Sequence, residues 1–197
     1  MGKLTSHLKD KRIGLAITGS FCTFHTALIC AEEIASLGVQ LTAILSHNTA
    51  MMDTRFMSAE CLKDSLTEIC GRVPICSIED AEPIGPGKLF DLLLVLPATG
   101  NTIGKLANGI TDTPVCMAVK SHLRNNRPVV LAISTNDALG GSAVNIGRLL
   151  NAKNIYFVPF CQDDPINKPK SMVFVKDMVI PAVEEALEGR QLQPILG

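Results

Sequence analysis

Residues 91–113 read DLLLVLPATGNTIGKLANGITDT, a stretch in which a continuous apolar run leads into a short polar loop. The run at 92–96 is typical of a parallel strand buried on both faces, and Pro97 is expected to end it. Small, hydroxyl and amide side chains follow at 98–102, before a helical pattern. Backbone N–H groups at a helix start are unpaired and can hold an anion. We therefore expect a ligand site at the end of this strand.

The rest of the chain alternates between strand and helix patterns. Apolar runs predict further strands at 12–18, 39–45, 73–78, 128–133 and 154–159. Helical spacing predicts helices at 21–37, 55–70, 114–124, 142–150 and 173–188, and Pro and Gly mark loops at 82–87 and 163–169. Such alternation implies right-handed crossovers between parallel strands. The sequence thus predicts an α/β chain with a three-layer Rossmann-like fold and a mainly parallel sheet. We expect a single domain over 1–197, with a polar N-terminal arm at 1–11 and a linker and C-terminal helix at 163–197.

Composition argues against several classes of function. The 197 residues are 47% hydrophobic and carry a net charge of −1, so there is no basic surface of the kind that nucleic acid requires. No apolar stretch reaches the roughly 20 residues of a membrane helix, and 1–12 has no signal-peptide core, which leads us to expect a cytoplasmic chain without a membrane partner. The seven cysteines form no CxxC pair and are expected to be reduced packing residues, with a catalytic thiol or a metal cluster as the alternatives. No histidine pair has metal-ligand spacing, so no metal site is expected.

Four predicted strand ends carry the same kinds of residue. They are 18–20 (TGS), 46–48 (SHN), 98–102 (ATGNT) and 134–137 (STND). Ligands of parallel sheets bind outside the carboxyl ends of the strands, where these loops converge. Hydroxyl and amide groups from separate loops suit a polar or phosphorylated cofactor, although each loop alone could simply cap a helix or make a turn.

Some ionisable and flexible side chains are further candidates. His47 directly follows the second strand and is a candidate for ligand contact or proton transfer near neutral pH, and His25 is a weaker one. We expect His7 and His122 at the surface or at an interface. Cationic groups could hold an anionic ligand, and the candidates are Lys105, Lys120, Arg124 and Arg148, although each could instead lie on a solvated helix face. Four flexible or aromatic side chains could either form a mobile flap over a flat ring or pack in the core or against a neighbouring subunit; they are Met51, Met52, Phe56 and Met57.

The segments 97–102 (PATGNT) and 104–112 (GKLANGITD) resemble the flavoprotein family that contains the homo-oligomeric flavin-containing cysteine decarboxylases. The resemblance extends over 12–159. It implies that Gly19 and Ser20 hold the flavin phosphate, that Ser46 belongs to the cofactor site, and that Asn101 is the active-site Asn. It places the ring and ribityl contacts at Ala98, Thr99 and Thr102. The family's PAMN loop falls on 133–136, where Thr135 and Asn136 become cofactor-binding candidates. From the residues alone, Asn101 could instead cap the following helix.

Two departures bear on the activity. The decarboxylases carry a catalytic His near the position of Pro83, and only Asn136 of their PAMN loop is kept. The chain particularly resembles the smaller subunit of a two-subunit oxidoreductase, which implies oxidation of a dihydropyridine dicarboxylate to its aromatic form. No GxGxxG motif follows the first strand, so we do not expect this chain to bind a nicotinamide cofactor on its own. The resemblance implies that a separate A subunit binds NADP or NAD and that FMN is a possible cofactor of this chain. It also implies a homo-oligomer, a trimer or dodecamer. The alternatives are a non-catalytic partner with a degenerate flavin site and an FMN-dependent decarboxylase.

Overall fold

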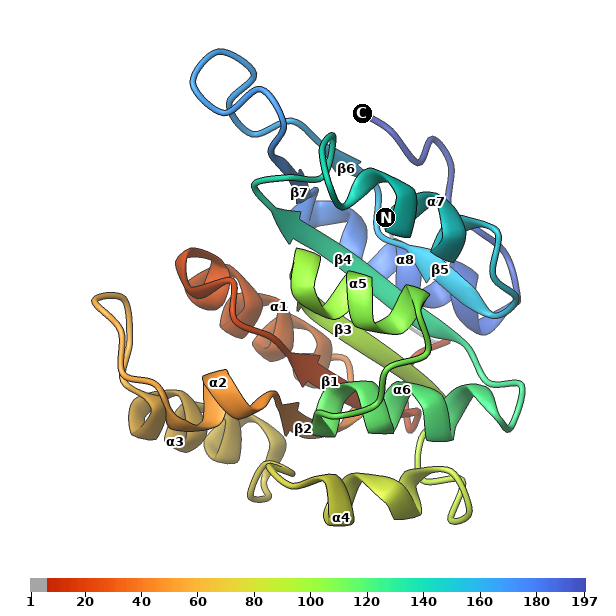
Figure 1. Cartoon of the computed structure of the whole chain (residues 1–197). Helices are drawn as coiled ribbons and strands as arrows, with labels where there is room; N and C mark the ends of the chain where they lie inside the picture. The colour runs from red at the N-terminus through yellow and green to blue at the C-terminus, as the bar shows by residue number, and fades with distance from the viewer. Residues whose placement is uncertain (1–6) are drawn as a thin grey trace.

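The computed structural model describes residues 7–197, in which strands and helices alternate along most of the chain (Figure 1). The strands are β1 (Arg12–Ile17), β2 (Gln40–Leu45), β3 (Leu92–Ala98), β4 (Val129–Thr135), β5 (Ile155–Phe157), β6 (Phe160–Cys161) and β7 (Met172–Phe174). The helices are α1 (Phe24–Ser36), α2 (His47–Met51), α3 (Ala59–Cys70), α4 (Ile78–Ala81), α5 (Gly100–Ala107), α6 (Pro114–Leu123), α7 (Ala143–Leu150) and α8 (Val179–Leu187). Short 3₁₀ turns, η1 to η3, lie at Phe21–Thr23, Glu82–Ile84 and Lys176–Met178.

One sheet runs through the molecule in the order β2-β1-β3-β4-β7-β6, with β5 also paired to β4. The strands β1 to β5 are parallel. The end of β4 pairs antiparallel with β7, which in turn pairs antiparallel with β6. This arrangement confirms the predicted mainly parallel sheet and adds an antiparallel corner that the sequence patterns did not indicate.

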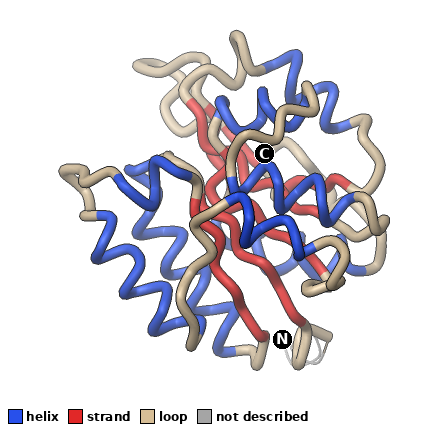
Figure 2. The backbone as a smooth tube through the Cα atoms, turned by 60° about the horizontal axis from the view of Figure 1, so that its bottom comes forward, coloured by secondary structure: helices blue, strands red, loops and turns tan. Residues whose placement is uncertain are grey.

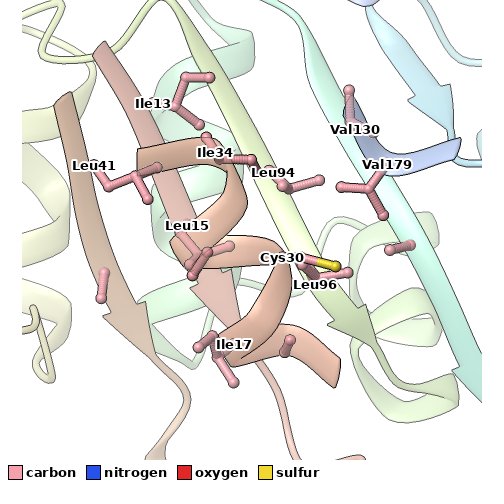
Figure 3. Close-up of a cluster of buried hydrophobic side chains, with 14 of the residues drawn as sticks. Ile13, Leu15, Ile17, Cys30, Ile34, Leu41, Leu94, Leu96, Val130 and Val179 are labelled. Carbon is pink, nitrogen blue, oxygen red and sulfur yellow. The ribbon is translucent and has the colours of Figure 1, made fainter. Parts of the chain in front are cut away.

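Helices cover both faces of the sheet, as the tube view shows (Figure 2). On one face, α1, α3 and α8 pack on side chains such as Leu15, Leu41, Leu94 and Val130 (Figure 3). On the other face, α5, α6 and α7 pack on Val95, Leu131 and their neighbours. Because strand side chains alternate between faces, β3 is buried along its whole length, and its apolar run is explained by this double burial.

Pro97 does not end the central strand, contrary to the sequence-based expectation. β3 continues to Ala98, with a shift in its pairing to β4 between Val95 and Ala98. Proline lacks an N–H group, so it interrupts the regular ladder without stopping the strand. As a result Ala98 joins the core cluster on the α5–α7 face.

Several other predicted boundaries are wrong. Helix α3 begins at Ala59 rather than 55, because the Ser58 hydroxyl caps it and accepts the amide of Cys61 at 3.1 Å. The expected strand at 73–78 reduces to one bridge at Ile75 and is followed by α4, and the expected loop at 82–87 begins with η2. The expected helix at 173–188 starts as strand β7, and only Val179–Leu187 is an α-helix.

The polar N-terminal arm expected at 1–11 lies partly outside the described residues, which begin at His7. Leu8 is fully buried in the core, so this part of the expected arm is packed against the fold. The division into one domain stays a prediction. Within residues 7–197, no helix combines the length and apolar character needed to cross a membrane.

Candidate functional site

The polar strand ends meet at one edge of the sheet, where direct hydrogen bonds join them. The Thr18 hydroxyl, after β1, donates to the carbonyl oxygen of Pro97 at 2.7 Å and accepts the amide of Thr99 at 3.1 Å. The Ser20 hydroxyl lies 2.8 Å from that of Ser134 on β4. Loops from three strands are therefore held together by side chains that the sequence analysis selected for function.

Helix starts supply donors at the same edge. Ser46 and Thr99 cap α2 and α5 by accepting the amides of Thr49 and Thr102, each at 3.4 Å. Because Thr99 occupies the cap position of α5, the alternative role of Asn101 as the helix cap is excluded. In the described part of the chain, the first amides of η1, α2 and α5 have no hydrogen-bond acceptor; they are Phe21, Cys22, His47, Asn48, Gly100 and Asn101. Together with the helix dipoles, these amides favour anionic groups.

The larger opening at this edge, here the first cavity, has a volume of about 560 Å³. Its polar wall includes Gly19, Ser20, Thr99, Ser134, Thr135 and Asn136. Across from these lie Arg55 and Phe56, whose guanidinium and ring stack at 4.8 Å, and the β6–β7 connection with Lys168 and Ser171. Phe56 is half-exposed at this cavity, and this exposure is compatible both with a flap over a ring and with ordinary packing. A cavity of this size is in the range of cofactor sites.

A smaller opening of about 330 Å³, here the second cavity, lies beside the first and shares Gly19 and Thr99 with it. The candidates His47, Asn101, Thr102 and Ser46 line it. Both catalytic candidates thus lie at one cavity, with His47 and Asn101 exposed to it. Lys105 also lines this cavity, where its ammonium nitrogen lies 2.6 Å from both carboxylate oxygens of Asp112. The hydrogen bond from Lys105 lowers the pKa of Asp112, which favours the ionised carboxylate.

A carboxylate network borders the first cavity; Asp137 was expected in one of the converging loops but was given no role of its own. Asp137 Oδ1 accepts the hydroxyls of Thr135 at 2.6 Å and Ser142 at 2.9 Å. The Thr135 bond, followed by that of Ser142, lowers the pKa of Asp137. Gly100 lies directly over this network: a β-carbon there would lie within 2.9 Å of oxygen atoms of Thr135, Ser142 and Asp137. The sequence offered one signal for this network: Gly100 stands at the first position of α5, where a residue without a side chain allows close packing on polar groups.

Other candidates lie away from these cavities. Ala98 is fully buried, so its side chain faces the core and only its backbone lies near the site. His122, expected at the surface or an interface, is fully buried because α4 and η2 cover α6. Arg148 donates to the Asn108 side chain at 2.7 Å, and Lys120 and Arg124 lie at a different, apolar cavity. His25 is exposed on α1.

The cysteines differ in their burial and in their distance from the site. All seven cysteines are free, and burial raises the pKa of Cys30 and Cys70 to about 11, which makes them unreactive. Cys22 is exposed and lines the first cavity. Among residues 7–197, no three His, Cys, Asp or Glu side chains are placed to share a metal ion.

The donor set at this edge fits a flavin nucleotide. Unpaired amides and hydroxyl groups suit a phosphate and a polyhydroxyl chain, and the first cavity is large enough for a flat ring system beside them. The negatively charged Asp137 carboxylate would repel a phosphate placed at its end of the first cavity. A phosphate therefore fits better at the Gly19–Ser20 turn.

A family model described as Flavoprotein matches residues 1–185. The chain belongs to the flavoprotein family. It is 47% identical to the B subunit of dipicolinate synthase from Bacillus subtilis (strain 168) over 192 residues, which cover 97% of this chain and 96% of that protein.

Solved structures agree with this membership. The B subunit of dipicolinate synthase from Bacillus halodurans C is 41% identical and superposes with a TM-score of 0.89, over 97% of this chain and 98% of that one. The cypemycin decarboxylase CypD superposes with a TM-score of 0.69 at 19% identity, over 94% of this chain and 99% of that one, and so supports the fold alone. The Rossmann-like architecture predicted for a flavoprotein is thereby confirmed.

Proposed function

We propose that this chain acts as the B subunit of a dipicolinate synthase and takes part in the oxidation of dihydrodipicolinate to dipicolinate (pyridine-2,6-dicarboxylate) during sporulation. The observation that carries the proposal is the 47% identity to such a protein over 97% of the chain. The two cavities at the edge of the sheet lie where parallel α/β sheets bind ligands, and they are lined by most of the residues to which we assign the reaction.

We assign FMN to the first cavity and the neighbouring loops. The Gly19 amide, the Ser20 hydroxyl and the unpaired amides of Phe21 and Cys22 would hold the phosphate. The sugar chain and ring would be contacted by Ser46, Thr99, Thr102, Thr135 and Asn136. When bound, a flavin supplies a two-electron acceptor. The chain's own contribution is to orient this group and to cover it from the Arg55–Phe56 side.

The substrate belongs in the second cavity, in this proposal. The amide of Asn101 donates to a substrate carboxylate, and the unpaired N–H groups at the starts of α2 and α5 favour the same negative charge. His47 lies at the same cavity and takes the proton that leaves a ring carbon or nitrogen as the ring becomes aromatic. Asp112 holds Lys105 at the cavity wall through an ion pair, which leaves the ammonium group placed to reach a substrate carboxylate.

The electrons must leave this chain for the reaction to continue. The A subunit of the dipicolinate synthase, carrying NADP or NAD, is the partner that we assign to this step. The site would then operate in the cytoplasm of the mother cell, within a homo-oligomer of this chain such as a trimer or dodecamer.

The first test is titration of the purified chain with FMN, followed by the visible absorption and fluorescence of the flavin. We expect bound flavin, and protection of Cys22 from a thiol reagent, because Cys22 lines the first cavity. Cys61, exposed on α3, is the matched control and should label at the same rate with and without FMN.

Variants assign the two cavities separately. Gly19→Val adds side-chain bulk that points toward Phe21 and Asn48 between the cavities, so FMN should bind more weakly. Asn101→Ala should still bind FMN but should lower the activity of the synthase reconstituted with the A subunit. If the wild-type chain binds no FMN while its partner needs the chain for activity, a scaffold role replaces our proposal.

A further inference from the structure

An apolar cavity of about 390 Å³ lies between the end of α5, α6 and the start of β5, away from both site cavities. Its apolar walls are formed by Leu106, Ile110, Val119, Leu123 and Ile155. Val119 and Ile155 are buried, whereas Ile110 is 46% exposed at the rim. In Figure 1, α5 and α6 lie in front of the sheet on the same face as α7. An exposed apolar side chain beside a preformed hollow marks a binding surface.

Two cations stand at the rim of this apolar cavity. Lys120 on α6 and Arg124, the residue that directly follows this helix, are four positions apart, and both are exposed. Over the range 7–197, neither forms a salt bridge. Like charges at this spacing repel each other on a helix, and an anion placed between them removes that repulsion. The cavity therefore suits a large apolar group that has a carboxylate next to it.

The loop between α5 and α6 connects this apolar cavity to the candidate site. Ile110 and Thr111 line the apolar cavity, whereas Asp112 and Thr113 line the second cavity. Asp112 also holds Lys105 through the 2.6 Å ion pair. Whatever occupies the apolar cavity thus lies one short loop away from the proposed substrate.

We propose that the apolar cavity docks the nicotinamide-binding partner, through a segment that presents one large apolar side chain next to Asp or Glu. The inference rests on the proposed function, which requires a second chain to receive electrons close to the second cavity. Charge complementarity with Lys120 and Arg124 selects an acidic segment, and the size of the cavity selects a single buried anchor.

The test compares two full-length double variants with the same change of charge. Lys120→Glu/Arg124→Glu reverses the rim, while Lys9→Glu/Lys63→Glu changes positions that do not line the apolar cavity. Binding to the purified A subunit is measured by calorimetry. We expect the rim variant to bind the A subunit roughly tenfold more weakly, and the control to bind it with little change. Ile110→Asp should also weaken binding, and Ile110→Met should not.

Three results would overturn the inference. Unchanged affinity of the rim variant for the A subunit rules out docking at this cavity. A change in the oligomeric mass of the isolated rim variant, measured by sedimentation, identifies the face as a contact between copies of this chain. No binding of the A subunit to the wild-type chain removes the proposed occupant. FMN titration separates these failures from failure of the proposed cofactor site, because the rim variant leaves both site cavities intact.

Discussion

His122 is a buried ionisable residue that should make stability depend on pH. Its Nε2 lies 3.2 Å from the carbonyl oxygen of Pro128, and among the described residues its Nδ1 has no partner. Burial, together with the smaller effect of nearby Arg127, lowers the pKa of His122 to about 4, although the Pro128 carbonyl and Asp91 act in the opposite direction. The unfolded chain takes up the proton near pH 6.5 and the folded chain only near pH 4. The stability contributed by neutral His122 is therefore present above pH 6.5 and is lost as the pH falls toward 4.

From this difference, the free energy of unfolding should fall by about 2 kcal/mol between pH 7 and pH 5 because of His122. Urea unfolding at the two pH values measures it. His122→Gln should remove most of this pH dependence, whereas His25→Gln, at an exposed position, should keep it. An equal fall with pH in the His122→Gln variant would show that another group is responsible.

Gly100 is the residue whose lack of a side chain most directly shapes the first cavity. In Gly100→Ala the new methyl group would lie 2.7 Å from the Thr135 and Ser142 hydroxyl oxygens, so the Asp137 network must move. We expect a loss of about 1–3 kcal/mol of stability and weaker FMN binding. Gly104→Ala is the control, because its nearest neighbour, the Asn145 amide nitrogen, is 3.5 Å away. Equal behaviour of the two variants in FMN titration would show that the network does not support the cavity.

Helices and strands with a regular apolar pattern were predicted from the sequence, whereas elements that form only through tertiary contacts were missed. The buried strand at 92–96 and the polar loop after it were readable because burial on both faces leaves a continuous apolar run. The strand β7 was missed because three residues, MVF, continue smoothly into a helical pattern and only pairing with β4 makes them extended. For the candidate site, shared residue types at the strand ends predicted the convergence. The roles of Asp137 and Gly100 could not be predicted, because they depend on how α5 packs against the end of β4 and the start of α7.

The exposed edge of β5 is closed by a side chain instead of a strand. The Gln191 side-chain oxygen accepts the N–H of Phe157 at 2.7 Å, and its nitrogen donates to the Phe157 carbonyl oxygen at 2.8 Å, as a neighbouring strand would. Gln191→Leu leaves both backbone groups without this partner, and we expect it to cost about 1–3 kcal/mol of stability. Gln193→Leu, at an exposed position two residues further on, should cost much less. Urea unfolding compares them, and similar values would mean that water satisfies the edge.

Across the whole molecule, the site cavities lie at the carboxyl edge of the sheet, while the apolar cavity lies on the face formed by α5 and α6. Ligand binding at the edge should therefore stabilise the fold independently of the docking surface. At a free FMN concentration 100 times its dissociation constant, the stabilisation is about 2.7 kcal/mol, which raises Tm by about 5–10 °C in a chain of this size.

Thermal unfolding with and without FMN tests this separation. The Lys120→Glu/Arg124→Glu variant should show the wild-type increase in Tm, since neither residue lines the first or second cavity. Gly19→Val should show a smaller increase at the same FMN concentration, because its added side chain occupies the boundary that the two cavities share. If the rim variant lost the FMN-dependent increase while remaining folded, the loop from Gly109 to Thr113 would couple the two surfaces already in the isolated chain. In that case partner docking and cofactor binding would act on one shared conformational equilibrium, and each would change the affinity for the other by the same factor.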